Sequence, residues 1–162
     1  MYICAKQYDG MEIVEQKSIT IPKGETLALN GNILEWEGKK VCYVTSFVAF
    51  SHFAKNDDEK GLERHAKTRE ILSIIEAENK EYGEAVTAIL SQIDQENEDE
   101  LRQAQAQIEA LPYKPRDFFD HLKQTPSWAK CVTYDDWGNG VWNRDFYEAP
   151  LEVLDEMIAF LA

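Results

Sequence analysis

The longest regular pattern of apolar positions lies between Glu59 and Leu111. Apolar side chains recur there at steps of three and four residues, the spacing of one face of an α-helix. The first series is Leu72, Ile75, Tyr82, Val86, Ile89 and Ile93, with Asn79 in the one remaining place. The series loses phase after Ile93 and restarts as Leu101, Ala104, Ile108 and Leu111. The pattern predicts one helix over roughly 58–94 and a second over roughly 97–111, joined as a bent rod or as an antiparallel hairpin.

Capping signals support this division of the stretch. Asn56 stands three residues before Glu59, and Asn97 stands three residues before Glu100, which is the spacing of a capping box. Pro112 ends the second helix, because proline has no backbone N–H to donate. An apolar stripe of this length needs a covering partner. We therefore expect it to pack against the neighbouring helix or against a second copy of the chain.

Residues 1–55 have a different pattern, in which short extended segments alternate with turn residues. Asp9-Gly10 and Asn30-Gly31 supply the positive φ angles that tight β-hairpin turns require. Several short strands with frequent turns predict an antiparallel β meander, either open or closed into a small barrel.

The last part of the chain, residues 113–162, predicts a helix over 116–123, a β-hairpin around a Gly-rich turn, and a final helix that begins at Pro150. The fold class is therefore α+β: an N-terminal β module, a central long helix or helical hairpin, and a C-terminal β-hairpin with two short helices. Three parts result, namely 1–55, the helical arm 56–112, and 113–162. We expect the third part to pack with the first as one globular unit.

Charge changes this picture, because the formal net charge is −13. Residues 51–112 carry seven basic and 15 acidic side chains and so hold −8 of it. Such a surface repels nucleic acid and anionic membranes, so we expect neither as a direct partner. We expect a basic protein surface instead. The composition is similar to that of small acidic proteins that occupy the nucleic-acid groove of a target, with no alignable motif. The alternative is that the acidity only keeps the protein in solution.

Two groups of residues are the candidate binding sites. The first lies off the apolar stripe, where the second helix begins, and consists of Glu96, Glu98, Asp99 and Glu100. The second surrounds the Gly-rich turn of the predicted hairpin and consists of Asp135, Asp136, Trp137 and Trp142. Tryptophan is over-represented at binding hot spots, so this turn could form a recognition tip. The alternative is a plain hairpin whose Trp side chains cover the edge of the core.

Catalytic and metal-binding motifs do not emerge from the sequence. There is no Gly-rich phosphate loop and no zinc-ligand spacing. His121 has Asp117 one helical turn before it and Asp120 beside it, but no nucleophile motif accompanies them. We therefore expect no catalytic residue, no metal and no cofactor. Two alternatives stay open: a small hydrolase-like enzyme that uses a histidine with neighbouring carboxylates, and a self-associating assembly protein that dimerises through the helical arm.

The three cysteines, Cys4, Cys42 and Cys131, are widely spaced and odd in number. This pattern argues against a disulfide framework and for reduced thiols in a cytoplasm. No apolar run approaches the ~18 residues of a membrane span. The sequence as a whole predicts a cytoplasmic, non-enzymatic, acidic protein-binding module, in the role of an inhibitor or regulator that engages the basic nucleic-acid-binding surface of a target.

Overall fold

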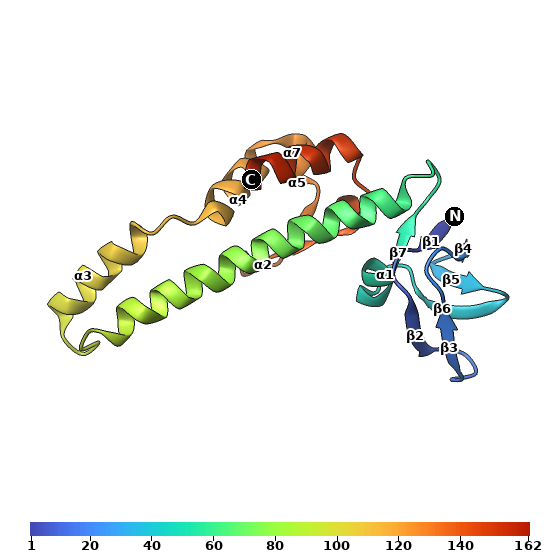
Figure 1. Ribbon diagram of the computed structural model, residues 1–162, viewed down its shortest axis with the longest axis horizontal. Coiled ribbons are helices and arrows are strands. Elements are labelled where there is room, and N and C mark those ends of the chain that lie inside the picture. Colours follow the sequence, from blue (N-terminus) through green and yellow to red (C-terminus); the bar gives the residue numbers. More distant parts are fainter.

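The computed structural model describes residues 1–162 and has the predicted α+β architecture (Figure 1). An antiparallel β module lies at one end of an elongated molecule. The long helix α2, Gly61–Ser91, runs from this module to the opposite end. The C-terminal segment folds back mainly beside the first half of α2, and the far end of α2 projects beside α3 (Figure 1).

The main sheet has five antiparallel strands in the order β6-β5-β4-β1-β7. Their bounds are β1 Tyr2–Cys4, β4 Thr26–Asn30, β5 Ile33–Trp36, β6 Lys39–Tyr43 and β7 Phe53–Lys55. The sheet is open, with β6 and β7 at its edges, and the small-barrel alternative is therefore wrong. The predicted Asn30-Gly31 turn is confirmed between β4 and β5, with Gly31 at a φ of 64°.

The turn predicted at Asp9-Gly10 is wrong. Both residues lie inside β2, Tyr8–Met11, which pairs with β3, Ser18–Ile21, as a separate two-stranded sheet. The Tyr8 side chain folds over Gly10 so closely that a Cβ at Gly10 would overlap the tyrosine ring. Glycine is thus required here for a close approach and not for a turn.

Helix α2 begins three residues later than predicted, at Gly61. The predicted Asn56–Glu59 capping box does not form. Instead, the Asn56 side chain accepts a 2.8 Å hydrogen bond from the Gly61 N–H, and Asp58 forms an ion pair with Arg64. A Cβ at Gly61 would come within 2.9 Å of the Ile3 side chain, so the helix start is held against strand β1 by long-range contact.

The second capping signal is confirmed for Asn97, but the Glu100 carboxylate does not complete the predicted box. Helix α3, Glu98–Glu109, has Asn97 as its N-cap, and the Asn97 side chain accepts hydrogen bonds from the N–H groups of Asp99, at 3.1 Å, and Glu100, at 3.2 Å. The Glu100 carboxylate accepts its own hydrogen bond from the Asp94 N–H at 3.1 Å, which closes the loop between the helices. Helices α2 and α3 form an antiparallel hairpin (Figure 1).

Two buried clusters hold the fold together. The first joins the β strands to the short helix α1, Phe47–His52, which begins at the N-cap Ser46. The second joins the first half of α2, through Ile71 and Ile75, to the C-terminal elements. Those elements are α4 Lys114–Gln124, α5 Pro126–Ala129, β8 Val132–Tyr134, β9 Gly140–Trp142, α6 Arg144–Tyr147 and α7 Leu151–Leu161. The C-terminal part therefore builds its core with α2.

Direct contacts connect the two clusters near the start of α2. The Phe50 and Tyr147 rings stack with centroids 4.5 Å apart. The Arg64 side chain is almost fully buried and donates to the carbonyl oxygens of Lys55 and Ala149, each at 3.0 Å. One guanidinium thus links β7, the start of α2 and the C-terminal segment.

None of the helices combines the length and the apolar composition that a membrane crossing requires.

Candidate functional site

The projecting part of the molecule carries most of its charge. We call residues 76–111 the distal arm: the second half of α2, the following loop, α3 and the residues that leave it. It holds ten carboxylates and only two cations, Lys80 and Arg102. Residues 51–75, which pack against the two cores, hold five acidic and five basic side chains. The −8 of the helical stretch therefore lies entirely on the distal arm.

These carboxylates are almost all without ion pairs. The exception is Asp99, which lies 3.5 Å from Arg102, and both side chains are largely exposed. The ten carboxylates are Glu76, Glu78, Glu81, Glu84, Asp94, Glu96, Glu98, Asp99, Glu100 and Glu109. Unpaired like charges on a narrow helical hairpin produce a negative potential along its length.

The apolar stripe is only half covered on the distal arm. Ala104 is the one fully buried residue there, while Ile75, further back in the second cluster, is 8% exposed. The half-buried apolar residues are Tyr82, Ala85, Val86, Ile89, Leu90, Ile93, Leu101, Ile108 and Leu111. Two helices cannot enclose a seam from all sides, so the distal arm presents a partly exposed apolar seam. Carboxylates lie at both of its ends, within residues 76–84 and 94–100.

The first group of predicted binding residues lies at the far end of the distal arm, in the loop and first turn of α3 (Figure 1). Glu96, Glu98 and Asp99 are exposed. Glu100 is half-buried, and its carboxylate is used by the Asp94 N–H. Acidic side chains in the first turn also interact favourably with the positive end of the helix dipole. Three of the four are therefore exposed toward a partner, with Asp99 also near Arg102, and Glu100 holds the loop.

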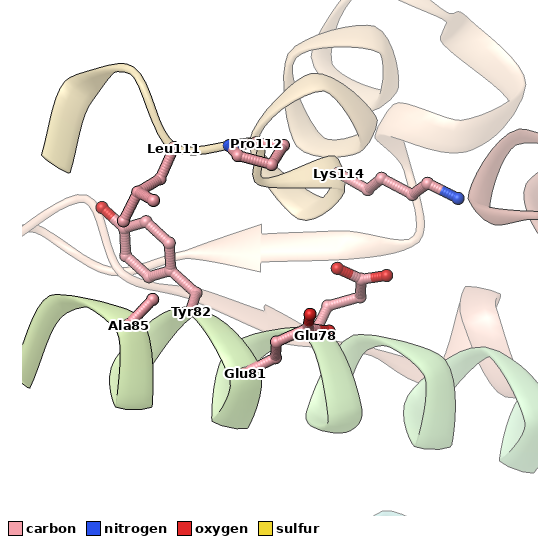
Figure 2. A pocket seen from close by; sticks show the side chains of 7 residues that line it. All are labelled: Glu78, Glu81, Tyr82, Ala85, Leu111, Pro112 and Lys114. Carbon is pink, nitrogen blue, oxygen red and sulfur yellow. The ribbon is translucent and has the colours of Figure 1, made fainter. Parts of the chain in front are cut away.

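A cavity of about 300 Å³ lies near the base of the distal arm, between α2 and the segment that leaves α3 (Figure 2). Its lining residues are Glu78, Glu81, Tyr82, Ala85, Leu111, Pro112 and Lys114. None of them was among the predicted site residues, because only the return of the chain over α2 creates the space. The signals that could have indicated it are an aromatic residue in the stripe and the proline that ends it.

The aromatic wall of this cavity is fixed by its neighbours. The Tyr82 ring stacks on Tyr113 with centroids 4.4 Å apart, and the Tyr113 hydroxyl donates to the Asn79 side chain. Asn79, the one polar residue in the apolar stripe, is exposed and accepts this hydrogen bond. Burial raises the pKa of Tyr113, and the nearby Tyr82 and Glu78 raise it further.

The second group of predicted binding residues surrounds the β8–β9 turn. The Asp135 carboxylate accepts hydrogen bonds from the N–H groups of Trp137, at 2.9 Å, and Asn139, at 2.8 Å. The Asn139 bond and then the Trp137 bond hold the pKa of Asp135 below its usual value. Asp135 therefore shapes the turn, and the neighbouring Asp136 is exposed.

The two Trp residues of this hairpin have different surroundings. Trp137 is 89% exposed at the turn. Trp142 is half-buried and stacks on Phe146 with centroids 4.0 Å apart, at the edge of the second cluster. No hydrogen bond or ion pair joins this turn to the tip of the distal arm. The structure therefore keeps the two predicted groups as separate surfaces, and only Trp137 of the two indoles is open to a partner.

The histidine of the enzyme alternative lies among aromatic rings. His121 stacks on Phe160 with centroids 5.0 Å apart and meets the Trp128 ring edge-on at 4.8 Å. No hydrogen bond joins it to Asp117 or Asp120. Across the chain, no group of three or more His, Cys, Asp and Glu side chains is arranged to hold a metal ion.

Comparison with known proteins finds no matching family model, no matching curated protein and no matching solved structure. Function is therefore inferred from charge, burial and cavity geometry.

Proposed function

We propose that this protein is a non-enzymatic binding module whose distal arm engages a basic surface of another protein. The observation that supports this most is the segregation of charge: ten carboxylates and two cations on a projecting hairpin, whereas residues 51–75, which pack against the two cores, carry five acidic and five basic side chains. A row of carboxylates along a helix presents a linear negative field, as a phosphate backbone does. A basic groove that binds nucleic acid would match it, which corresponds to the role of an inhibitor or regulator.

The half-buried seam defines the partner further. A partner that lies along the distal arm would cover apolar side chains such as Val86 and Ile89 while its cations meet the carboxylates at the base and the tip of the arm. Its surface would combine Lys or Arg with apolar residues. A second copy of the chain fits less well, because a homodimer through the arm would bring two regions of net charge −8 together.

A cytoplasmic location is part of the proposal. Cys4, Cys42 and Cys131 are all unpaired and buried, which supports a reducing compartment.

The test uses a defined basic ligand. A fluorescent amphipathic peptide of Lys and Leu, about 18 residues long and helical, is titrated with the protein, and a peptide of Glu and Leu serves as the negative ligand. We expect the basic peptide to bind and its affinity to fall steeply between about 20 and about 150 mM salt, because salt screens exposed charges. The acidic peptide should not bind.

Charge reversal then locates the contact. The tip variant changes Glu96, Glu98 and Asp99 to Lys and keeps Glu100, which caps the loop. Its matched control changes Glu25, Asp120 and Glu152 to Lys, three exposed carboxylates outside the arm. The tip variant should lose at least roughly tenfold in affinity and the control much less, since three contacts at up to about 1 kcal/mol each are lost. Equal losses, or an affinity indifferent to salt, would show that the acidity of the arm serves solubility alone.

A second binding surface is favoured by one observation, the 89% exposure of Trp137. Large aromatic side chains in this position are typical hot-spot residues. If the tip variant binds the peptide as the parent does, Trp137→Ser is the next change to test.

A further inference from the structure

We propose that the cavity at the base of the distal arm receives one Lys or Arg side chain of the basic partner, an inference that rests on the proposed function for the nature of that partner. The cavity volume of about 300 Å³ stands at the lower limit of small-molecule sites. A space of this size suits one long side chain. Its lining includes Glu78 and Glu81, two of the ten carboxylates of the distal arm, so the cavity belongs to the acidic part of the molecule.

The cavity has negative charge without a compensating cation. The Glu78 and Glu81 side chains leave one face of α2 and point into the gap below Pro112 (Figure 2). Neither carboxylate takes part in an ion pair. The one cation of the lining, Lys114, turns away from them, and its ammonium donates to the Leu161 carbonyl oxygen at 3.4 Å. A cation from outside would meet two carboxylates that the chain leaves unpaired.

The walls of the cavity suit the rest of such a side chain. Ala85, Leu111 and Pro112 provide aliphatic surface, and the Tyr82 ring forms an aromatic wall. Lys and Arg bury an aliphatic stem while their charged ends seek a polar partner, and a cation is attracted to the face of an aromatic ring. Because Tyr82 is already stacked on Tyr113, no rearrangement is needed to form the wall. An anionic or purely apolar group would leave the two carboxylates facing it without a counter-charge.

The cavity can be tested without the partner. Methyl and aromatic NMR resonances of Ala85 and Tyr82 are followed while n-butylguanidinium is added, with the neutral n-butylurea as the matched ligand. We expect saturable shifts at both residues with the guanidinium only. Glu78→Gln and Glu81→Gln should each weaken binding roughly two- to fivefold, the range of a partly exposed ion pair. Glu84→Gln, an exposed carboxylate of the same helix outside the cavity, is the control and should bind as the parent does.

Three results would overturn the inference. The first is equal shifts with butylurea, and the second is shifts that do not saturate. The third is a loss of butylguanidinium affinity in Glu84→Gln as large as the loss in Glu81→Gln. The tip variant separates this inference from the proposed function. It should leave the butylguanidinium affinity within about twofold, because its three charges lie at the start of α3, outside the cavity lining, and act on the cavity only through screening solvent. If the tip variant loses peptide binding but the cavity does not bind butylguanidinium, only the cavity inference is refuted. If the cavity binds butylguanidinium but the tip variant binds the peptide as the parent does, only the role of the tip is refuted.

Discussion

Replacing the buried Arg64 with Met should destabilise the protein more than a similar change at any other Lys or Arg. The Arg64 side chain is 6% exposed. Its Nε donates to the Ala149 carbonyl oxygen and its Nη1 to the Lys55 carbonyl oxygen, each at 3.0 Å, while its Nη2 pairs with Asp58. Met fills a similar volume but donates nothing. The substitution therefore removes the hydrogen bonds that join β7, α2 and the C-terminal segment without leaving a large cavity.

The magnitude follows from what is left behind. A hydrogen bond from a charged donor contributes about 1.5–3 kcal/mol, and a buried acceptor left without a donor costs about 1–3 kcal/mol. Removing the buried charge offsets part of this loss, because its desolvation penalty also disappears. With two carbonyl oxygens deprived of their donor, we expect Arg64→Met to lower the free energy of unfolding by about 2–4 kcal/mol. Arg69 offers a matched control, since its side chain is half-buried and makes one hydrogen bond, to the Phe50 carbonyl oxygen at 3.0 Å. Arg69→Met should cost about 1 kcal/mol.

Urea unfolding measures both variants, with helical circular dichroism and Trp fluorescence as the two signals. Coincident transitions would show that the two buried clusters unfold together. The reasoning is refuted if Arg64→Met unfolds within about 0.5 kcal/mol of the parent, or if Arg69→Met costs as much as Arg64→Met.

Three further predictions concern pH, thiol reactivity and the seam. Burial lowers the pKa of His65 below 6.5, so its contribution to stability is present above that value and is lost as pH falls through the folded-state pKa. The unfolding free energy should drop as pH falls below about 6.5, and His65→Gln should flatten this drop in urea titrations; an unchanged slope contradicts it. Burial raises the pKa of Cys131 to about 11, so its thiol should react with a disulfide reagent at least about 100-fold more slowly in the native state than in urea. Ile89→Asp should cost about 1–2 kcal/mol, below the values typical of full cores, because Ile89 is half-buried. A loss above about 4 kcal/mol in urea unfolding would mean that a second copy covers the seam.

Features that depend on neighbours in the chain could be predicted from the sequence. The three- and four-residue spacing indicated the long helix, and the phase jump with Asn97 located the start of α3. Asn30-Gly31 located a hairpin because the left-handed backbone at Gly31 is a local requirement. The acidic tip could be proposed for the same reason, since its four carboxylates fall within residues 96–100.

Features that depend on contacts between distant parts of the chain could not be predicted from the sequence. The start of α2 is fixed by the hydrogen bond from Arg64 to the Ala149 carbonyl oxygen and by the close approach of Ile3 to Gly61. Sequence spacing does not encode these partners, because each contact joins residues that lie far apart in the chain.

The charge and the cavity show the same division. The sequence by itself determined that the helical stretch is acidic, but the tertiary structure decided that the charge lies on the uncovered half, because the C-terminal elements bury only the first half of α2. Glu78 and Glu81 have ordinary positions on a helix surface. They line a cavity only because Leu111 and Pro112 return over the same turns of α2 on their way to the second core.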